Sequence, residues 1–200
     1  NATDFGDMNI TTFSGGASSS PTRGVRFGGG SSDEISYITI ASTGNALDFG
    51  NLTVAPNAPV GCSSTTRGLA AGGDSPNSTN IIDYVTIATA GNAADFGDLT
   101  ADRSNAGGLS SATRGVFAGG YDPQGSPAAE EDTIDYVTIA STGNATDFGN
   151  MSESGQGTRG LASSTRGVYN IGYNTPNGSR NTMEYLTISS TGNGTDFGNL

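Results

Sequence analysis

Short apolar runs recur along the chain at nearly fixed intervals, and stretches rich in Gly, Ser, Thr and Asn separate them. In the third interval, 133–141 alternates apolar and polar positions and is rich in β-branched residues, while 114–120 is apolar and ends in two glycines. These patterns predict strands over 107–113, 114–120, 133–141 and 144–151. No run has a sustained apolar period of 3.6 residues, so almost no helix is expected.

The Asp-Phe-Gly tripeptide occurs five times and marks an internal repeat. Its aspartates are Asp4, Asp48, Asp95, Asp147 and Asp196, which sets a repeat length of 44 to 52 residues. A Thr-Arg-Gly arginine follows each of the first four aspartates by 19 residues: Arg23, Arg67, Arg114 and Arg166. A tyrosine precedes each of the last four aspartates by 11 residues: Tyr37, Tyr84, Tyr136 and Tyr185. Only the stretch from arginine to tyrosine varies in length, which predicts a fixed scaffold carrying one variable loop per repeat.

Four short antiparallel strands in each 40–50 residues are typical of a β-propeller blade. One such sheet cannot bury both of its faces, whereas stacked sheets can. We therefore expect an all-β fold, a β-propeller of four-stranded antiparallel blades with a repeat of ~48 residues. The four full blades would run at about 14–52, 58–99, 105–151 and 159–200. An open β-repeat or solenoid filament is the alternative, which the long period disfavours.

The chain opens and closes at equivalent points of the repeat. Residues 1–13 would then be the outer strand of a preceding blade, and 1–200 one repeat domain within a longer polypeptide. The leading strand would need three further strands, either from sequence outside this segment or from another copy of the chain. Whether the blades close into a ring within one polypeptide stays open at this point.

Composition narrows the classes of partner. The formal net charge of −11 repels phosphate backbones, so nucleic acid is not expected as a partner. No stretch approaches the ~18 apolar residues of a membrane helix, so membrane insertion is not expected either. Five residues before the repeat arginines stand Ser18, Cys62, Leu109 and Leu161, which predicts an inner packing position and makes Cys62 an inert buried thiol.

The residue inventory offers little for catalysis. A kinase pairs one Asp-Phe-Gly with a lysine, but this chain has no lysine and no histidine. Calcium binding needs several converging oxygens, and one carboxylate beside a phenylalanine does not supply them. We expect no enzyme activity, no cofactor and no metal site. The repeated aspartates and arginines are expected to be structural, through ion pairs between blades or turn caps.

The glycine pairs Gly72–Gly73 and Gly119–Gly120, the repeated tyrosines and the phenylalanines of Asp-Phe-Gly resemble the pattern of kelch propeller blades, with phenylalanine in place of the kelch tryptophan. The sequence "TRGVFAGG…IDYVTIASTGNATDFGN" is similar to repeats in structural proteins of marine tailed bacteriophages, particularly those that infect cyanobacteria. This resemblance implies a tail fibre or other appendage, located on the virion or at an extracellular surface. Its partners would be other virion or appendage subunits, and copies of the chain itself are further candidates.

Recognition is expected from the variable loops, at 30–34, 74–80, 121–133 and 173–182, which would share one face of a propeller. The candidate residues in them are polar or aromatic and suit contacts with a host-surface glycan or protein: Asp74, Tyr121, Asp122, Tyr173 and Asn177. The alternative function is a secreted carbohydrate-active enzyme built on a kelch-like propeller.

Overall fold

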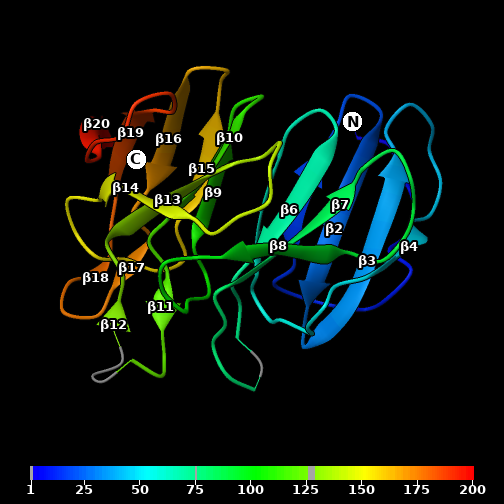
Figure 1. Cartoon of the computed structure of the whole chain (residues 1–200), viewed down its shortest axis with the longest axis horizontal. Helices are drawn as coiled ribbons and strands as arrows, with labels where there is room; N and C mark the ends of the chain where they lie inside the picture. The colour runs from blue at the N-terminus through cyan, green and yellow to red at the C-terminus, as the bar shows by residue number, and fades with distance from the viewer. Residues whose placement is uncertain (1, 75, 126–128) are drawn as a thin grey trace.

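The computed structural model describes residues 2–74, 76–125 and 129–200, and within them it contains strands and no helix. Most strands form four antiparallel sheets of four strands each, repeating every 40–50 residues (Figure 1). The first sheet is β1 (Gly16–Ser19), β2 (Arg23–Gly29), β3 (Ser32–Thr39) and β4 (Leu47–Asn51). The second is β5 (Val60–Ser63), β6 (Arg67–Ala71), β7 (Ile81–Thr86) and β8 (Ala94–Asp98). The third is β9 (Gly107–Ser110), β10 (Arg114–Ala118), β13 (Thr133–Thr138) and β14 (Thr146–Asn150). The fourth is β15 (Arg159–Ala162), β16 (Arg166–Asn170), β19 (Thr182–Thr187) and β20 (Thr195–Asn199).

The predicted strands of the third interval are all present, with shorter ends. The segment 107–113 is a strand only to Ser110, because the Ser111 hydroxyl accepts hydrogen bonds from the backbone N–H groups of Thr113 and Arg114 at 3.3 and 3.1 Å. This side-chain cap turns the chain directly into β10. The same serine cap stands at Ser20, Ser64 and Ser163, so each sheet begins with the same tight connection.

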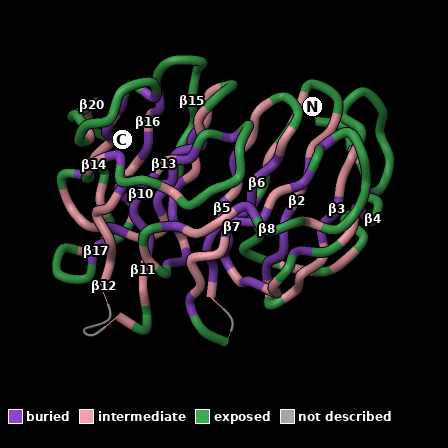
Figure 2. Tube along the Cα trace, in the orientation of Figure 1, coloured by how far each residue is buried: buried purple, intermediate pink, exposed green. Residues whose placement is uncertain are grey.

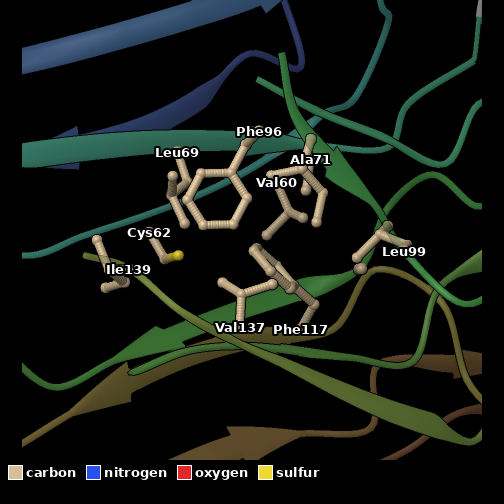
Figure 3. Close-up of a cluster of buried hydrophobic side chains, with 11 residues drawn as sticks. Val60, Cys62, Leu69, Ala71, Phe96, Leu99, Phe117, Val137 and Ile139 are labelled. Atoms are coloured by element: carbon tan, nitrogen blue, oxygen red, sulfur yellow. The ribbon is translucent and has the colours of Figure 1, made fainter. Parts of the chain in front are cut away.

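Among the described residues, the buried side chains form three hydrophobic clusters, each lying between one sheet and the next. Figure 2 colours the buried residues purple along the chain. Figure 3 shows the middle cluster, where Leu69 and Phe96 of the second sheet meet Phe117 and Val137 of the third. Each sheet therefore has a forward face, turned toward the following sheet, and a backward face, turned toward the preceding one. The first sheet packs through its forward face and the fourth through its backward face, while the two middle sheets pack through both. The alternation of side chains along each strand produces the two faces: Val116 points forward and Phe117 backward.

Glycine is what lets the inner strands approach each other. The inner strands β1, β5, β9 and β15 lie side by side in this order. A Cβ on Gly61 would lie 2.1 Å from the backbone oxygen of Ala17, and one on Gly108 would lie 2.3 Å from the oxygen of Gly61. The predicted small-residue inner strand thus reflects backbone-to-backbone contact between sheets.

Three local features differ from the sequence expectations. Residues 2–13 contain no strand, because no described strand pairs with them as β13 pairs with β14. The expected loop 30–34 is a tight turn, since β3 already begins at Ser32. The loops at 121–133 and 173–182 each contain a small hairpin, formed by β11 (Tyr121–Asp122) with β12 (Ala129–Glu130) and by β17 (Tyr173–Asn174) with β18 (Gly178–Ser179). Since the described residues contain no helix, they contain none that is long and apolar enough to cross a membrane.

Candidate ligand-binding face

The aspartate of Asp-Phe-Gly is a turn cap. In all five copies its Oδ1 accepts a hydrogen bond from the N–H of the glycine two residues later, at 2.9–3.1 Å. The ion pairs found among the described residues, Arg103–Asp135 and Arg180–Glu153, do not involve these aspartates or the repeat arginines. The alternative of ion pairs between repeats is therefore wrong for them.

The repeat arginine joins neighbouring sheets without a carboxylate. Each guanidinium lies over the repeat tyrosine of its own sheet, 4.3–4.6 Å from the ring centroid, and that ring packs edge-on against the Asp-Phe-Gly phenylalanine. Arg23, Arg67 and Arg114 also donate Nη1–H to the carbonyl of Ile87, Ile139 and Ile188 in the following sheet, at 2.9–3.1 Å. These signature residues are therefore part of the scaffold that joins the sheets.

The segments that lead into the inner strands surround a cavity of about 310 Å³. All four inner-strand segments contribute to its wall, including Gly15, Ala58, Asn105 and Thr158. The residue two positions before each inner strand has a left-handed backbone: Ser14, Ala58, Asn105 and Gly157, with φ of 54°, 53°, 56° and 67°. Non-glycine residues rarely adopt this conformation, and such strain concentrates at functional sites. Gly157 N–H donates to the Asn105 carbonyl and Asn105 N–H to the Ala58 carbonyl, at 2.9 and 3.2 Å, so hydrogen bonds link these segments along the cavity wall.

The variable loops lie at this same end of the sheets. Their bridges reach the segments just before the inner strands: Asn57 pairs with Asp74, Ser104 with Tyr121, and Gln156 with Tyr173. In Figure 1 the small hairpins β11–β12 and β17–β18 both project from the lower edge of the sheets. We call this surface, formed by the described residues of loops 74–80, 121–133 and 173–182 around the cavity, the loop face.

Successive loops are tied to each other by side-chain hydrogen bonds. Gln124 donates Nε2–H to Asn77 Oδ1 at 2.9 Å, which joins the second and third loops. Glu130 accepts from the Thr175 hydroxyl and from Gln156 Nε2, which joins the third loop to the fourth repeat. The Thr175 bond lowers the pKa of the Glu130 carboxyl, because it favours the ionised form. The loops thus form one connected polar surface.

The five candidate residues all lie on the loop face but do not converge on a single point. The Asp74 carboxylate accepts from Asn57 Nδ2 at 3.0 Å and from the Ser104 hydroxyl at 3.3 Å. The Tyr121 carbonyl pairs with Ser104, so Ser104 brings Asp74 and Tyr121 together. Asp122 Oδ1 caps the N–H of Gln124 at 2.9 Å within its own loop. Residues 75 and 126–128 of these loops, and residue 1, lie outside the described residues.

Tyr173 and Asn177 belong to the fourth loop. Tyr173 is 44% exposed, which makes it the most exposed aromatic side chain on the loop face. Asn177 donates its Nδ2–H to Asn174 Oδ1 at 3.1 Å and so shapes the hairpin β17–β18. Of the five candidates, Tyr173 and Asn177 are exposed, and Tyr173 is the aromatic one of the two.

Sequence reasoning missed several polar residues that build this face. Arg103 is 1% exposed, pairs with Asp135, and donates to the carbonyls of Gly119 and Thr133 at 3.3 and 3.0 Å. Burial lowers the pKa of Arg103, while Asp135 and Glu131 oppose the shift. Arg103 falls outside the Thr-Arg-Gly pattern, so no repeat signal marked it. Asn57, Ser104 and Gln156 each stand ten residues before a repeat arginine, but their side chains differ from copy to copy. The repeat therefore marked the position and not its contacts, and only the fold brings these residues to the loops.

Cys62 is 5% exposed in the cluster between the second and third sheets, and burial raises the pKa of its thiol to about 12. No group of three or more His, Cys, Asp or Glu side chains among residues 2–74, 76–125 and 129–200 is arranged to hold a metal ion. The chain matches no protein-family model, and a comparison with curated proteins finds no match.

Proposed function

We propose that the four sheets are consecutive blades of a β-propeller-type module, and that the module is a non-enzymatic structural and adhesive part of a virion or another extracellular surface. In this role the loop face recognises a host-surface glycan or protein. The observation that carries the proposal is the division between a nearly invariant scaffold and loops that vary in length yet join into one polar surface around a cavity.

The chemistry of the loop face fits recognition by hydrogen bonds and aromatic stacking. Amide and hydroxyl groups such as Asn77, Gln124 and Thr175 are interleaved with Tyr121 and Tyr173. Sugars present hydroxyls at their rims and apolar C–H faces, so a surface of amides around an exposed tyrosine suits a neutral glycan. The net charge of −11 disfavours an acidic one.

The carboxylates of the face support binding more than hydrolysis. A glycosidase needs two carboxylates that face each other across a substrate. Here Asp74 is engaged by Asn57 and Ser104, and Glu130 by Thr175 and Gln156. Each of them thus ties its loop to a neighbouring segment.

A glycan array, followed by titration of any hit with the soluble oligosaccharide, tests this function. Tyr173→Ser is expected to weaken binding at least about tenfold, because an aromatic platform for a sugar is lost. Phe197→Ser is the matched control, since Phe197 is similarly exposed at 50% but lies in β20, away from the loop face. Equal binding by wild type and Tyr173→Ser, or an equal loss in both variants, would contradict binding of the glycan by the loop face.

A further inference from the structure

The forward face of the fourth sheet is uncovered. Phe197 is 50% exposed, whereas the equivalent Phe49, Phe96 and Phe148 are 2–3% exposed. Leu161 and Leu200 are 72% and 75% exposed, whereas their equivalents Leu109 and Met151 in the third sheet are 2% and 3% exposed. The same positions that form the core between sheets thus make an apolar patch here.

The backward face of the first sheet is also uncovered, and it is the kind of face that a forward face packs against inside the molecule. Ile40 is 45% exposed, while its equivalents Ile87, Ile139 and Ile188 are each 1% exposed. A hollow of about 220 Å³ on this face is lined by residues that include Met8, Arg26, Ile38 and Ala46. The two uncovered faces are the two halves of the interface that each internal pair of sheets makes.

Residues 4–8 occupy part of that interface. Phe5 and Asp7 accept backbone hydrogen bonds from Gly44 and Ala46, at 2.8 Å each, and Asn45 Oδ1 accepts from Asp7 N–H at 3.0 Å. The outer strands β4, β8 and β14 make the same three bonds to the Gly-Asn turn of the following sheet. We call the turn 44–46 the seat. Residues 4–8 (Asp-Phe-Gly-Asp-Met) fill it, and β20 with Leu200 carries the nearly identical Asp-Phe-Gly-Asn-Leu.

Side chains across the internal interfaces match in size. Phe27 shares a cluster with the small Ala70, Phe117 with Ala71, and Tyr169 with Ala118, so at this position each cluster combines a large side chain of one sheet with a small one of its neighbour. The equivalent positions at the two open faces are Asn170 and Arg26, by the fixed count from Thr-Arg-Gly. They would set an amide opposite a guanidinium, a polar pair where the internal interfaces have an apolar one. The open faces thus complement each other.

From these observations we infer that the chain associates head to tail with a second copy of itself. The forward face of the fourth sheet docks on the backward face of the partner's first sheet, and β20 takes the seat from residues 4–8 of that partner. The exchange replaces three hydrogen bonds by three equivalent ones, while Phe197, Leu161, Leu200 and Ile40 gain cover. Arg166 would gain the Ile40 carbonyl of the other copy, as Arg114 has that of Ile188.

Such a contact joins two different surfaces, so it either closes into a ring or continues as a filament. The inference extends the proposed function to self-assembly but does not depend on the loop face. The faces involved lie on β20 and the first sheet, away from Tyr173.

Two equivalent glycines provide a matched test by sedimentation velocity of the full chain, from about 1 µM to about 1 mM, the range of weak to moderate association. A Cβ at Gly6 would lie 2.4 Å from the Gly44 oxygen, and φ there is 144°. A Cβ at Gly198 meets nothing within 4 Å, with φ at 128°. In the three internal copies, Gly50, Gly97 and Gly149, the clash with the turn is at 2.5–2.6 Å.

The two substitutions are expected to have opposite effects. Gly6→Ala expels residues 4–8 from the seat and should tighten association about tenfold. Gly198→Ala blocks docking of β20 and should leave a monomer, although both variants carry a similar backbone strain. Circular dichroism shows that each variant keeps the β fold. A monomeric wild type across the whole range, or association that Gly198→Ala leaves unchanged, would overturn the inference.

A charge test addresses the orientation. Asn170→Asp places a carboxylate opposite Arg26 of the second copy and should tighten association, whereas Asn170→Arg should weaken it. Equal effects of the two substitutions would overturn the head-to-tail arrangement. Titration of the Gly198→Ala variant with the soluble oligosaccharide separates the two proposals. If this variant binds the oligosaccharide but the wild type does not self-associate, only the head-to-tail inference is overturned.

Discussion

At the scale of single residues, the repeat arginines of the first three sheets make two kinds of contact at once, a cation–π contact and a hydrogen bond. Arg114 lies 4.4 Å above the Tyr136 ring and donates to the Ile188 carbonyl of the next sheet at 3.0 Å. Arg166 lies over Tyr185 in the same way, but no described residue accepts a hydrogen bond from its guanidinium. A comparison of the two arginines therefore measures the contribution of the Arg114–Ile188 hydrogen bond between sheets.

Arg114→Met is therefore expected to lower the free energy of unfolding by about 1–3 kcal/mol, through loss of the cation–π contact and a charge-assisted hydrogen bond. Arg166→Met should cost about 1 kcal/mol or less, because only the stacking contact is lost. Urea unfolding followed by circular dichroism measures both. Equal losses would show that the bond to Ile188 contributes nothing.

A second residue-scale prediction concerns Asp83, which is 2% exposed and accepts from the Thr53 N–H and hydroxyl at 2.7 and 2.8 Å. Burial raises the pKa of this carboxyl above its ordinary value of 3.8, against the effect of the Thr53 bonds. A raised pKa means that the folded state prefers the protonated carboxyl. The stability that the protonated Asp83 contributes is therefore lost as the pH rises from 3.8 through the raised pKa.

Asp83→Asn removes this titration. The free energy of unfolding of the wild type, measured relative to Asp83→Asn, should therefore fall as pH rises from about 4 to about 7. Urea unfolding of both proteins over this pH range provides the values. A relative stability of the wild type that rises with pH would show the opposite sign of shift.

At the scale of elements, the repeat predicts most of what the sheets do and little of what the loops do. The alternation in 133–141 and the apolar run 114–120 predicted β13 and β10, because the side-chain period of a strand is visible in one short segment. The hairpins β11–β12 and β17–β18 have only two paired residues per strand, too few to leave a pattern in the sequence. The role of Ser104 in joining Asp74 to Tyr121 depends on contacts between segments about 17 to 30 residues apart, which no local signal encodes.

The glycine pairs that follow β6 and β10 show how an element depends on its neighbour. Gly72 has φ of 63°, and a Cβ there would lie 2.3 Å from the Arg103 carbonyl oxygen in the segment that leads to the third sheet. Gly72→Ala should therefore cost about 2 kcal/mol or more, because backbone must move and the conformation is strained. Gly91→Ala is the control, since a Cβ there meets nothing within 4 Å and φ is not left-handed. Thermal unfolding compares the two, and a similar melting temperature for both would contradict the close approach at Gly72.

At the scale of the whole molecule, the account depends on sheets that cover each other. The sequence predicted this coverage, since one sheet with apolar residues on both faces cannot bury them alone. The sequence could not predict that the outer faces of the first and fourth sheets are exposed. Equivalent residues carry the same motif whether or not another sheet lies against them. Phe96 and Phe197 belong to the same Asp-Phe-Gly motif, yet one is 2% exposed and the other 50%.

The most direct measurement of this coverage is the free energy of unfolding of Phe96→Ala and Phe197→Ala, at a dilution where the chain is monomeric. Phe96→Ala is expected to cost about 3–5 kcal/mol, since it opens a cavity between the second and third sheets. Phe197→Ala should cost about 1 kcal/mol or less, because Phe197 is 50% exposed: its ring packs edge-on against Tyr185 and has no sheet in front of it. Losses of equal size in the two variants would contradict the claim that neighbouring sheets stabilise each other.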